Sequence, residues 1–299
     1  MNEKVHYTHC PVCKSETINP LLTVKDFTVS GEEFVVWQCD MCTVRFTQDV
    51  PDASSIAPYY KSENYISHTN AAKGLVNQLY LKVRNYTLGQ KADLISEYTR
   101  LKSGHLLDVG AGTGAFLNTM KQRGWDVKGL EPDEDARKLA ETLHGVTVAD
   151  SSQLFEFQPR SFDAITLWHV LEHVHDLHDY IKQLKNILRK DGRLFIAVPN
   201  YTSLDASHYG PFWAAYDVPR HLYHFTPKSI EVLLKQHGLS LEAKKPMWFD
   251  SFYISMLSTK YHRGKTNMVG SFFNGLRSNV KAAFDKDRCS SIIYIIKKG

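Results

Sequence analysis

Apolar and polar positions in the middle of the chain alternate between strand-like and helix-like spacing. Short apolar runs predict buried strands over 106–109, 125–130, 146–149, 162–167 and 193–198. Apolar residues recur at helical spacing between these runs, and the helices are expected to end at Gly124, Gly145 and Gly192. Strands that alternate with helices are typical of a parallel sheet with helices on both faces. The pattern therefore predicts an α/β, doubly wound, Rossmann-like sheet.

Downstream of this region the pattern predicts one more helix and two strands. Thr226 and Pro227 form a helix start, and that helix is expected to end at Gly238. The segments 239–249 and 290–297 are expected to pair as a closing antiparallel hairpin. The basic stretch between them is polar enough to form a solvated helix.

Composition and charge limit the possible classes of protein. The chain has 299 residues, 43% of them hydrophobic, which is enough for one large domain or two. The sequence has no stretch that is apolar and long enough to cross a bilayer, and its N-terminus lacks the apolar core of a signal peptide. We therefore expect a cytoplasmic protein without a membrane partner.

Four cysteines near the N-terminus form two Cys-x-x-Cys pairs, Cys10/Cys13 and Cys39/Cys42. Four thiolates on two short turns suit tetrahedral zinc, and such a small unit needs the metal to fold. The alternatives are two disulfides, which a reducing cytosol disfavours, and a redox pair, which usually needs one such motif. We predict a structural zinc ribbon over 1–50, while Cys289 is expected to be a packed thiol.

Three glycines follow the first predicted strand at alternate positions, Gly110, Gly112 and Gly114. A turn without Cβ atoms lets a ligand approach the backbone, and the following helix directs its first amides toward the same crevice. Glu131 lies about where a ribose-binding carboxylate belongs in a dinucleotide fold. The turn alone is compatible with a nucleotide-type ligand-binding protein, an NAD-type oxidoreductase or a methyltransferase.

The context of the turn, with Asp108 inside the strand and Asp150 after the third strand, resembles the class I S-adenosylmethionine-dependent methyltransferases. The resemblance covers about 106–200. It implies S-adenosyl-L-methionine as cofactor, bound by Asp108 and the glycine turn, with Glu131 on the ribose hydroxyls and Asp150 on the adenine amine. The alternative readings are an acidic loop residue for Glu131 and an ordinary turn and helix start for Asp150.

A Leu-Glu-His-Val segment follows the fourth predicted strand. In the same family the residues just before this segment line the methionine part of the cofactor, which implies that role for Trp168 and His169. His169 and His173 are four residues apart, a spacing that on a helix could hold a metal. We disfavour that reading because no third ligand has a matching spacing.

Residues 51–103 are expected to form a helical lid or linker. Helical spacing over 75–86 resumes over 94–98 after Gly89, which predicts a pair of helices packed on the sheet. In the family such a segment closes over the cofactor, and aromatic faces suit a sulfonium cation. Tyr60 and Tyr65 are therefore candidates for cofactor contacts.

Neither strand-like nor helix-like spacing of apolar residues continues over 201–225, a segment inside the predicted methyltransferase domain 104–299. An insertion after the fifth strand lies on the cofactor side of the sheet, so we expect it to form the acceptor site. A zinc ribbon before such a domain resembles the front part of sugar C-methyltransferases, which carry a Glu-His pair at the position of Arg220-His221. The resemblance implies that His221 is the general base.

Arg220 replaces the acid of that pair, which leaves Asp217, His224 or a water chain to orient His221. In the alternative interpretation, His221 and His224 only hydrogen-bond the backbone of the loop.

The sequence thus predicts methyl transfer to a small, carbohydrate-like acceptor. An RNA methyltransferase with a zinc module is the alternative. The first fifty residues hold four Lys/Arg against seven Asp/Glu, which argues against it, but the last forty hold nine against two and could contact phosphates.

Overall fold

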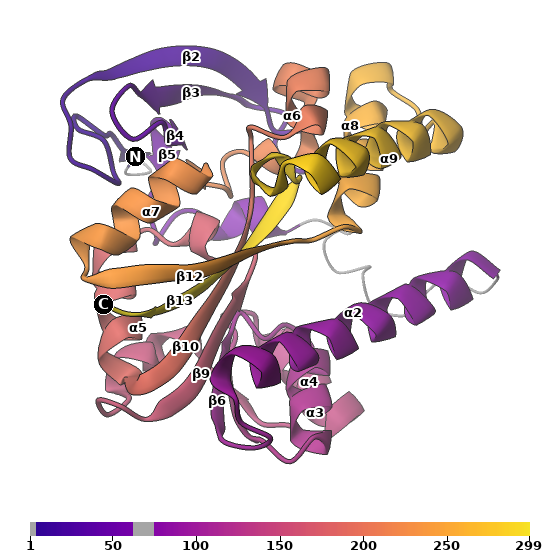
Figure 1. Cartoon of the computed structure of the whole chain (residues 1–299). Coiled ribbons are helices and arrows are strands. Elements are labelled where there is room, and N and C mark those ends of the chain that lie inside the picture. Colours follow the sequence, from indigo (N-terminus) through magenta and orange to yellow (C-terminus); the bar gives the residue numbers. More distant parts are fainter. Residues whose placement is uncertain (1–3, 62–74) are drawn as a thin grey trace.

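The computed structural model describes residues 4–61 and 75–299 and contains a seven-stranded central sheet (Figure 1). Its strands run in the order β12-β13-β10-β9-β6-β7-β8, and β13 is antiparallel to both of its neighbours while β10, β9, β6, β7 and β8 pair in parallel. Their bounds are β6 His105–Val109, β7 Asp126–Leu130, β8 Val148–Ala149, β9 Phe162–Trp168, β10 Leu188–Pro199, β12 Leu239–Pro246 and β13 Ser291–Lys298. The expected doubly wound sheet with a closing antiparallel hairpin is confirmed.

Helices cover both faces of this sheet because successive strand residues point to opposite sides. Leu106 packs with helices α2 (Leu75–Thr99), α3 (Ala115–Gln122) and α4 (Glu134–His144). Its neighbour Leu107 packs on the other face with α5 (Leu177–Ile187) and α7 (Pro227–Gln236). Short 3-10 turns complete the connections: η1 Ala57–Tyr60, η2 Ser151–Glu156, η3 Leu171–His173 and η6 Lys286–Arg288.

Two glycines that were expected to end or interrupt helices have other roles. The pair of helices predicted around Gly89 is wrong, because α2 is continuous from Leu75 to Thr99. Packing of Ala92 and Ile95 against the sheet outweighs the roughly 1 kcal/mol that a helical glycine costs. Gly192 lies inside β10, where a Cβ would come within 2.9 Å of the Asp163 carbonyl. Helix α5 therefore ends earlier, at Ile187.

The N-terminal unit is a small antiparallel sheet that a distant segment completes. Strands β2 (Ile18–Lys25), β3 (Glu33–Cys39) and β4 (Arg45–Thr47) form a meander, and β1 (Lys4–Val5) pairs with β5 (Val50–Pro51). The fourth strand of the meander is β11 (Tyr223–His224), in which Tyr223 pairs with Phe46. The segment 201–225 is also more regular than expected, since it contains α6 (Leu204–Tyr209) and the turns η4 (Gly210–Phe212) and η5 (Ala214–Tyr216).

Two helices, α8 (Asp250–Arg263) and α9 (Met268–Phe284), connect β12 to β13. A single solvated helix was expected there, and that prediction is wrong. Figure 1 shows the two helices side by side at one end of the molecule, next to α6. In the described part of the chain, no helix combines the length and apolar character needed to cross a membrane.

Candidate functional site

The glycine turn lies at the carboxyl end of β6, and its three glycines all have positive φ angles, +72°, +52° and +75°. A Cβ on Gly110 would meet Val170 Cγ2 at 2.4 Å, and one on Gly114 would meet Val146 Cγ2 at 2.7 Å. A Cβ on Gly112 would meet no described atom within 4 Å. The outer two glycines are therefore required by packing, whereas Gly112 borders open space that a ligand can enter.

A buried carboxylate, Asp108, and a half-buried one, Glu131, flank this turn. Glu131 directly follows β7, and its Oε2 accepts a 2.9 Å hydrogen bond from the Gly112 amide. Asp108 is 1% exposed and accepts a 2.6 Å bond from the Thr166 hydroxyl. Burial raises the pKa of Glu131 and raises that of Asp108 to about 7. The carboxylates are thus held near the open backbone of the turn, and their contacts with S-adenosylmethionine stay a prediction.

Asp150 follows β8 and lies beside this site. Its carboxylate accepts from the Ser152 amide at 3.0 Å and from Arg137 Nη1 at 3.1 Å. Arg137 also donates to the Glu131 carbonyl, so it links the ends of β7 and β8. The helix-start geometry of Asp150 matches its alternative reading, and its contact with adenine stays a prediction.

Trp168 and His169 lie at the end of β9 as expected. The Trp168 ring packs edge-on against Phe116 and lies 4.2 Å from the Lys91 ammonium of α2. His169 has a φ of +58°, and its Nε2 lies 3.0 Å from Asp250 Oδ2 at the start of α8. Burial by itself lowers the pKa of His169, but Asp250 and Glu172 raise it to about 10. His169 is therefore protonated at neutral pH.

His169 and His173 do not share a helix face, since the only regular element over this stretch is the turn η3. His173 instead joins a cluster with Tyr60, Glu172 and His221. Its Nδ1 lies 3.0 Å from the Tyr60 hydroxyl, and its ring centroid is 4.6 Å from that of His221. Donor atoms of Glu172, His173 and His221 all lie within 4.8 Å of one another. Three distant segments thus converge on one point, and this set could accept protons or hold a cation.

The charge state of this cluster follows from its burial. Both carboxylate oxygens of Glu172 are buried without a hydrogen bond from any described residue, although His169 Nδ1 lies 3.3 Å away. Burial alone raises the pKa of Glu172, but the three nearby histidines lower it below the usual value. Burial and His221 lower the pKa of His173 to about 4. At neutral pH a carboxylate therefore lies beside a neutral imidazole.

His221 lies in the segment 201–225 with its Nδ1 2.8 Å from the Ala215 carbonyl. Its Nε2 lies 3.9 Å from Asp217 Oδ2, so Asp217 is the nearest replacement for the missing acid within that segment. Arg220 points away, toward Asp26 and Asp217. His224, the other candidate, packs inside the ribbon with Nε2 3.2 Å from the Thr47 hydroxyl, and burial lowers its pKa well below the usual value.

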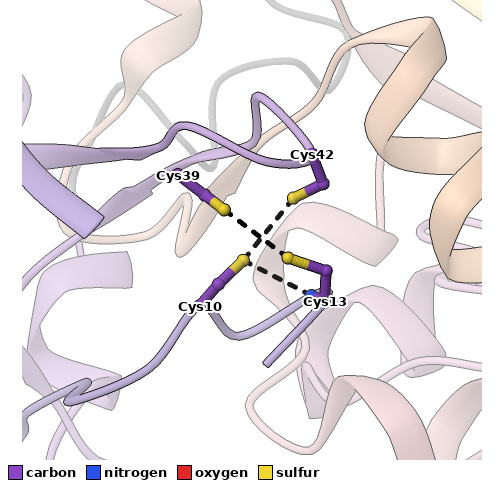
Figure 2. Close-up of side chains that lie close together, drawn as sticks. All are labelled: Cys10, Cys13, Cys39 and Cys42. Atoms are coloured by element: carbon purple, nitrogen blue, oxygen red, sulfur yellow. Dashed lines mark hydrogen bonds between the residues drawn. The ribbon is translucent and has the colours of Figure 1, made fainter. Parts of the chain in front are cut away.

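The four N-terminal cysteines converge from two turns (Figure 2). Their Sγ atoms all lie within 4.8 Å of one another, and the Cys10–Cys42 and Cys13–Cys39 pairs are each 3.5 Å apart. Zinc–sulfur bonds of about 2.3 Å in a tetrahedron require sulfurs about 3.8 Å apart. The four thiolates therefore fit a zinc ion with no open position for chemistry. Cys289 is buried at the far end of the chain, as expected of a packed thiol.

Several residues of the site were not assigned from the sequence. The Leu-Glu-His-Val segment was the sequence signal that could have suggested Glu172 and His173. Asp250 and Lys91 gave no sequence signal, because their partners lie on other elements. Tyr60 lies in η1 and contacts the cluster, whereas Tyr65 is outside the residues that the structure describes.

Comparison with known proteins agrees with this geometry. Residues 80–244, more than half of the chain, match a family model described as a methyltransferase domain. The chain belongs to this methyltransferase family. It resembles the ubiquinone biosynthesis O-methyltransferase of Xanthomonas euvesicatoria, with 26% identity over 54% of this chain and 72% of that protein. The Glaesserella parasuis protein of the same name is 37% identical over 33% of this chain and 46% of its own length.

Solved structures agree with the methyltransferase fold. The magnesium protoporphyrin IX methyltransferase of Synechocystis, with bound SAH, aligns over 83% of this chain and all of that one (TM-score 0.55, 14% identity). The Burkholderia thailandensis 1,6-didemethyltoxoflavin-N1-methyltransferase aligns over 92% and 99% (TM-score 0.51, 13% identity). The family match, the relatives and the glycine turn together identify an S-adenosylmethionine-dependent methyltransferase.

Proposed function

We propose that this methyltransferase acts on a small hydroxylated molecule, carbohydrate-like in character, with His221 as the general base. S-adenosylmethionine supplies an electrophilic methyl group when bound, so the chain must orient the acceptor and remove its proton. The observation that carries the proposal is the convergence of Tyr60, Glu172, His173 and His221. Such a set of polar groups, built on three segments, suits an acceptor that offers several hydroxyls.

The tautomer of His221 supports its role. A carbonyl oxygen only accepts hydrogen bonds, so the 2.8 Å contact with Ala215 requires the proton on Nδ1. The lone pair is then on Nε2, the atom that would take the acceptor's proton. Asp217, 3.9 Å from Nε2, would stabilise the imidazolium that forms.

The relatives named for ubiquinone biosynthesis favour a second acceptor class, a phenolic hydroxyl. Both classes lose a proton from oxygen or an activated carbon, so both require a base. An RNA acceptor would instead give affinity that falls steeply with salt.

A methylation assay that measures S-adenosylhomocysteine formation can test these options with nucleotide-linked sugars, catechols and RNA. Sugar methylation supports the proposal, whereas turnover of catechols or RNA alone overturns the carbohydrate-like assignment. With an active acceptor, His221→Asn should lower turnover by roughly 10² to 10⁴-fold at unchanged cofactor affinity. His208→Asn, an exposed histidine on α6, is the matched control. A native rate for His221→Asn would assign the base elsewhere.

A further inference from the structure

Helix α9 has its apolar side turned outward. Its buried positions are small or polar: Ser271, Gly275, Ser278 and Ala282. Its exposed positions include large apolar side chains at every fourth residue, with exposed fractions from 41% to 87%: Met268, Phe272, Leu276, Val280 and Phe284. This is the reverse of a helix on the surface of a soluble domain. Phe272 stacks on the Phe252 ring of α8, with centroids 5.3 Å apart, yet all five side chains of the stripe keep a large exposed fraction.

The small side chains inside the α8–α9 hairpin explain how it holds together. A Cβ on Gly275 would lie 2.8 Å from the Phe252 ring and 3.0 Å from its Cα, so the glycine allows the helices to approach closely. The hydroxyls of Ser271 and Thr259 lie 3.0 Å apart across the same interface. Small residues and hydroxyls hold helices together without using large apolar side chains. Phe272 still stacks on Phe252, whereas Phe273 and Phe284 are 61% and 87% exposed and are left for another surface.

Charge indicates what that surface is. Residues 251–284 contain five Lys/Arg and no Asp/Glu. Arg277 and Lys281 are exposed on α9, and Lys260, Arg263 and Lys265 lie at the exposed end of the hairpin. None of the five forms an ion pair with a described residue. A second copy of this face would bring like charges together, whereas an anionic bilayer offers both lipid tails and opposite charge.

We propose that the α8–α9 hairpin docks on the surface of an anionic lipid membrane, with the apolar stripe of α9 inserted among the headgroups. An apolar side combined with lysines and arginines is typical of helices that lie in the membrane interface. The hairpin also adjoins the reaction site, because α8 begins at Asp250, which contacts His169. Docking would therefore bring the active site close to the membrane. This inference does not depend on the identity of the acceptor, and it replaces the expectation of a protein without a membrane partner.

Sedimentation of the full chain with vesicles tests the proposal. Vesicles of phosphatidylcholine with about a third phosphatidylglycerol should bind the protein, and phosphatidylcholine alone should bind it far less, with salt weakening the binding. Phe273, 61% exposed, lies beside the stripe on α9, and Phe284 lies at its end. The double variant Phe273→Ser/Phe284→Ser should lower the partition coefficient by about tenfold or more. Arg277→Glu/Lys281→Glu should remove the preference for anionic vesicles.

Matched controls lie on other helices. Leu143→Ser changes a side chain that is 44% exposed on α4, and Lys228→Glu/Lys235→Glu changes two exposed cations on α7; neither should alter binding. Circular dichroism and S-adenosylmethionine affinity verify that each variant is folded. Failure of the wild type to bind anionic vesicles overturns the proposal, as does equal loss in the controls. Two other results would overturn the proposal if the protein does not bind vesicles. One is dimer formation that depends on Phe273 and Phe284, and the other is RNA binding that requires Arg277 and Lys281.

Discussion

The guanidinium of Arg220 lies 3.0 Å from the carboxylate of Asp26, and 194 residues separate the two in the sequence. Both side chains are buried, with exposed fractions of 1% and 0%. Arg220 also contacts Asp217 at 2.6 Å, and Asp217 faces His221. Two ion pairs thus connect the N-terminal sheet to the proposed base. We expect damage to this connection to affect the acceptor step.

Asp26→Asn should destabilise the fold by about 3 to 5 kcal/mol, because it leaves Arg220 buried with one anionic partner fewer. Turnover should fall more than cofactor affinity, since the lost contact is on the acceptor side. Urea denaturation, calorimetry with S-adenosylmethionine and an activity assay measure the three effects. Glu33→Gln, an exposed residue of β3, is the control. A variant with native stability and native turnover would show that the ion pair has no such role.

We predict one zinc ion per chain, lost in both Cys10→Ser and Cys42→Ser, because each removes one of four ligands. Cys289→Ser should retain the metal. Turnover should fall together with the zinc content, since β4 of the ribbon pairs with β11 of the acceptor segment. Elemental analysis of freshly reduced protein is the measurement, and an absence of zinc from the wild type would contradict the assignment.

Glu131→Ala should weaken S-adenosylmethionine binding by about 1.5 to 3 kcal/mol, the range for a hydrogen bond to a charged group. The side chain is fixed by the Gly112 and Asp133 amides, so its removal should leave the strand in place. Calorimetry can measure the loss. Glu134→Gln, at the exposed start of α4, should bind the cofactor normally. Unchanged affinity in Glu131→Ala would place the ribose elsewhere.

Gly112→Val should abolish cofactor binding while the protein stays folded. The added side chain would fill the open space above the turn. Gly145→Val is a close control, because Gly145 has a φ of +59° against +52° for Gly112, and a Cβ there also meets no described atom within 4 Å. Backbone strain should therefore be similar in the two variants, and only Gly112→Val should lose the cofactor. Equal cofactor affinity in the two variants would show that Gly112 does not border the cofactor-binding site.

The pKa of His169 predicts how stability depends on pH. A histidine whose pKa is raised to about 10 stabilises the fold fully below its unfolded value of 6.5, and this contribution disappears as the pH rises toward 10. The free energy of unfolding of the wild type should therefore fall between about pH 7 and 10 relative to that of His169→Gln. Parallel pH profiles for the two proteins would mean that His169 does not hold a charge beside Asp250.

Local sequence signals were sufficient for the sheet and the glycine turn. Strand spacing, the Thr226–Ser229 capping box and the positive φ of Gly112 each depend on residues close in sequence. Contacts such as that of Asp250 with His169 join residues 81 positions apart. The spacing of apolar residues along the chain does not predict such contacts. The pairing of β11 with β4 was missed for the same reason, since a two-residue strand is too short to show a pattern.

Helix α9 could not be predicted correctly, for a different reason. Sequence interpretation assumes that apolar side chains face inward, and there the assumption fails. Phe272 and Phe284 are exposed, whereas Ser271 and Ser278 are buried. Only the packing of the hairpin on Gly275 reveals which side is inside.

Exchange of acceptor specificity between members of this family would have to respect the four-stranded sheet that β11 completes. A graft of residues 201–225 alone would place a foreign edge strand against β4 and remove the partner of Asp26. A graft of the N-terminal residues alone would leave β11 without its own neighbour. A working chimera therefore needs both segments from the same parent, although more than 140 residues of glycine turn, sheet and helices lie between them.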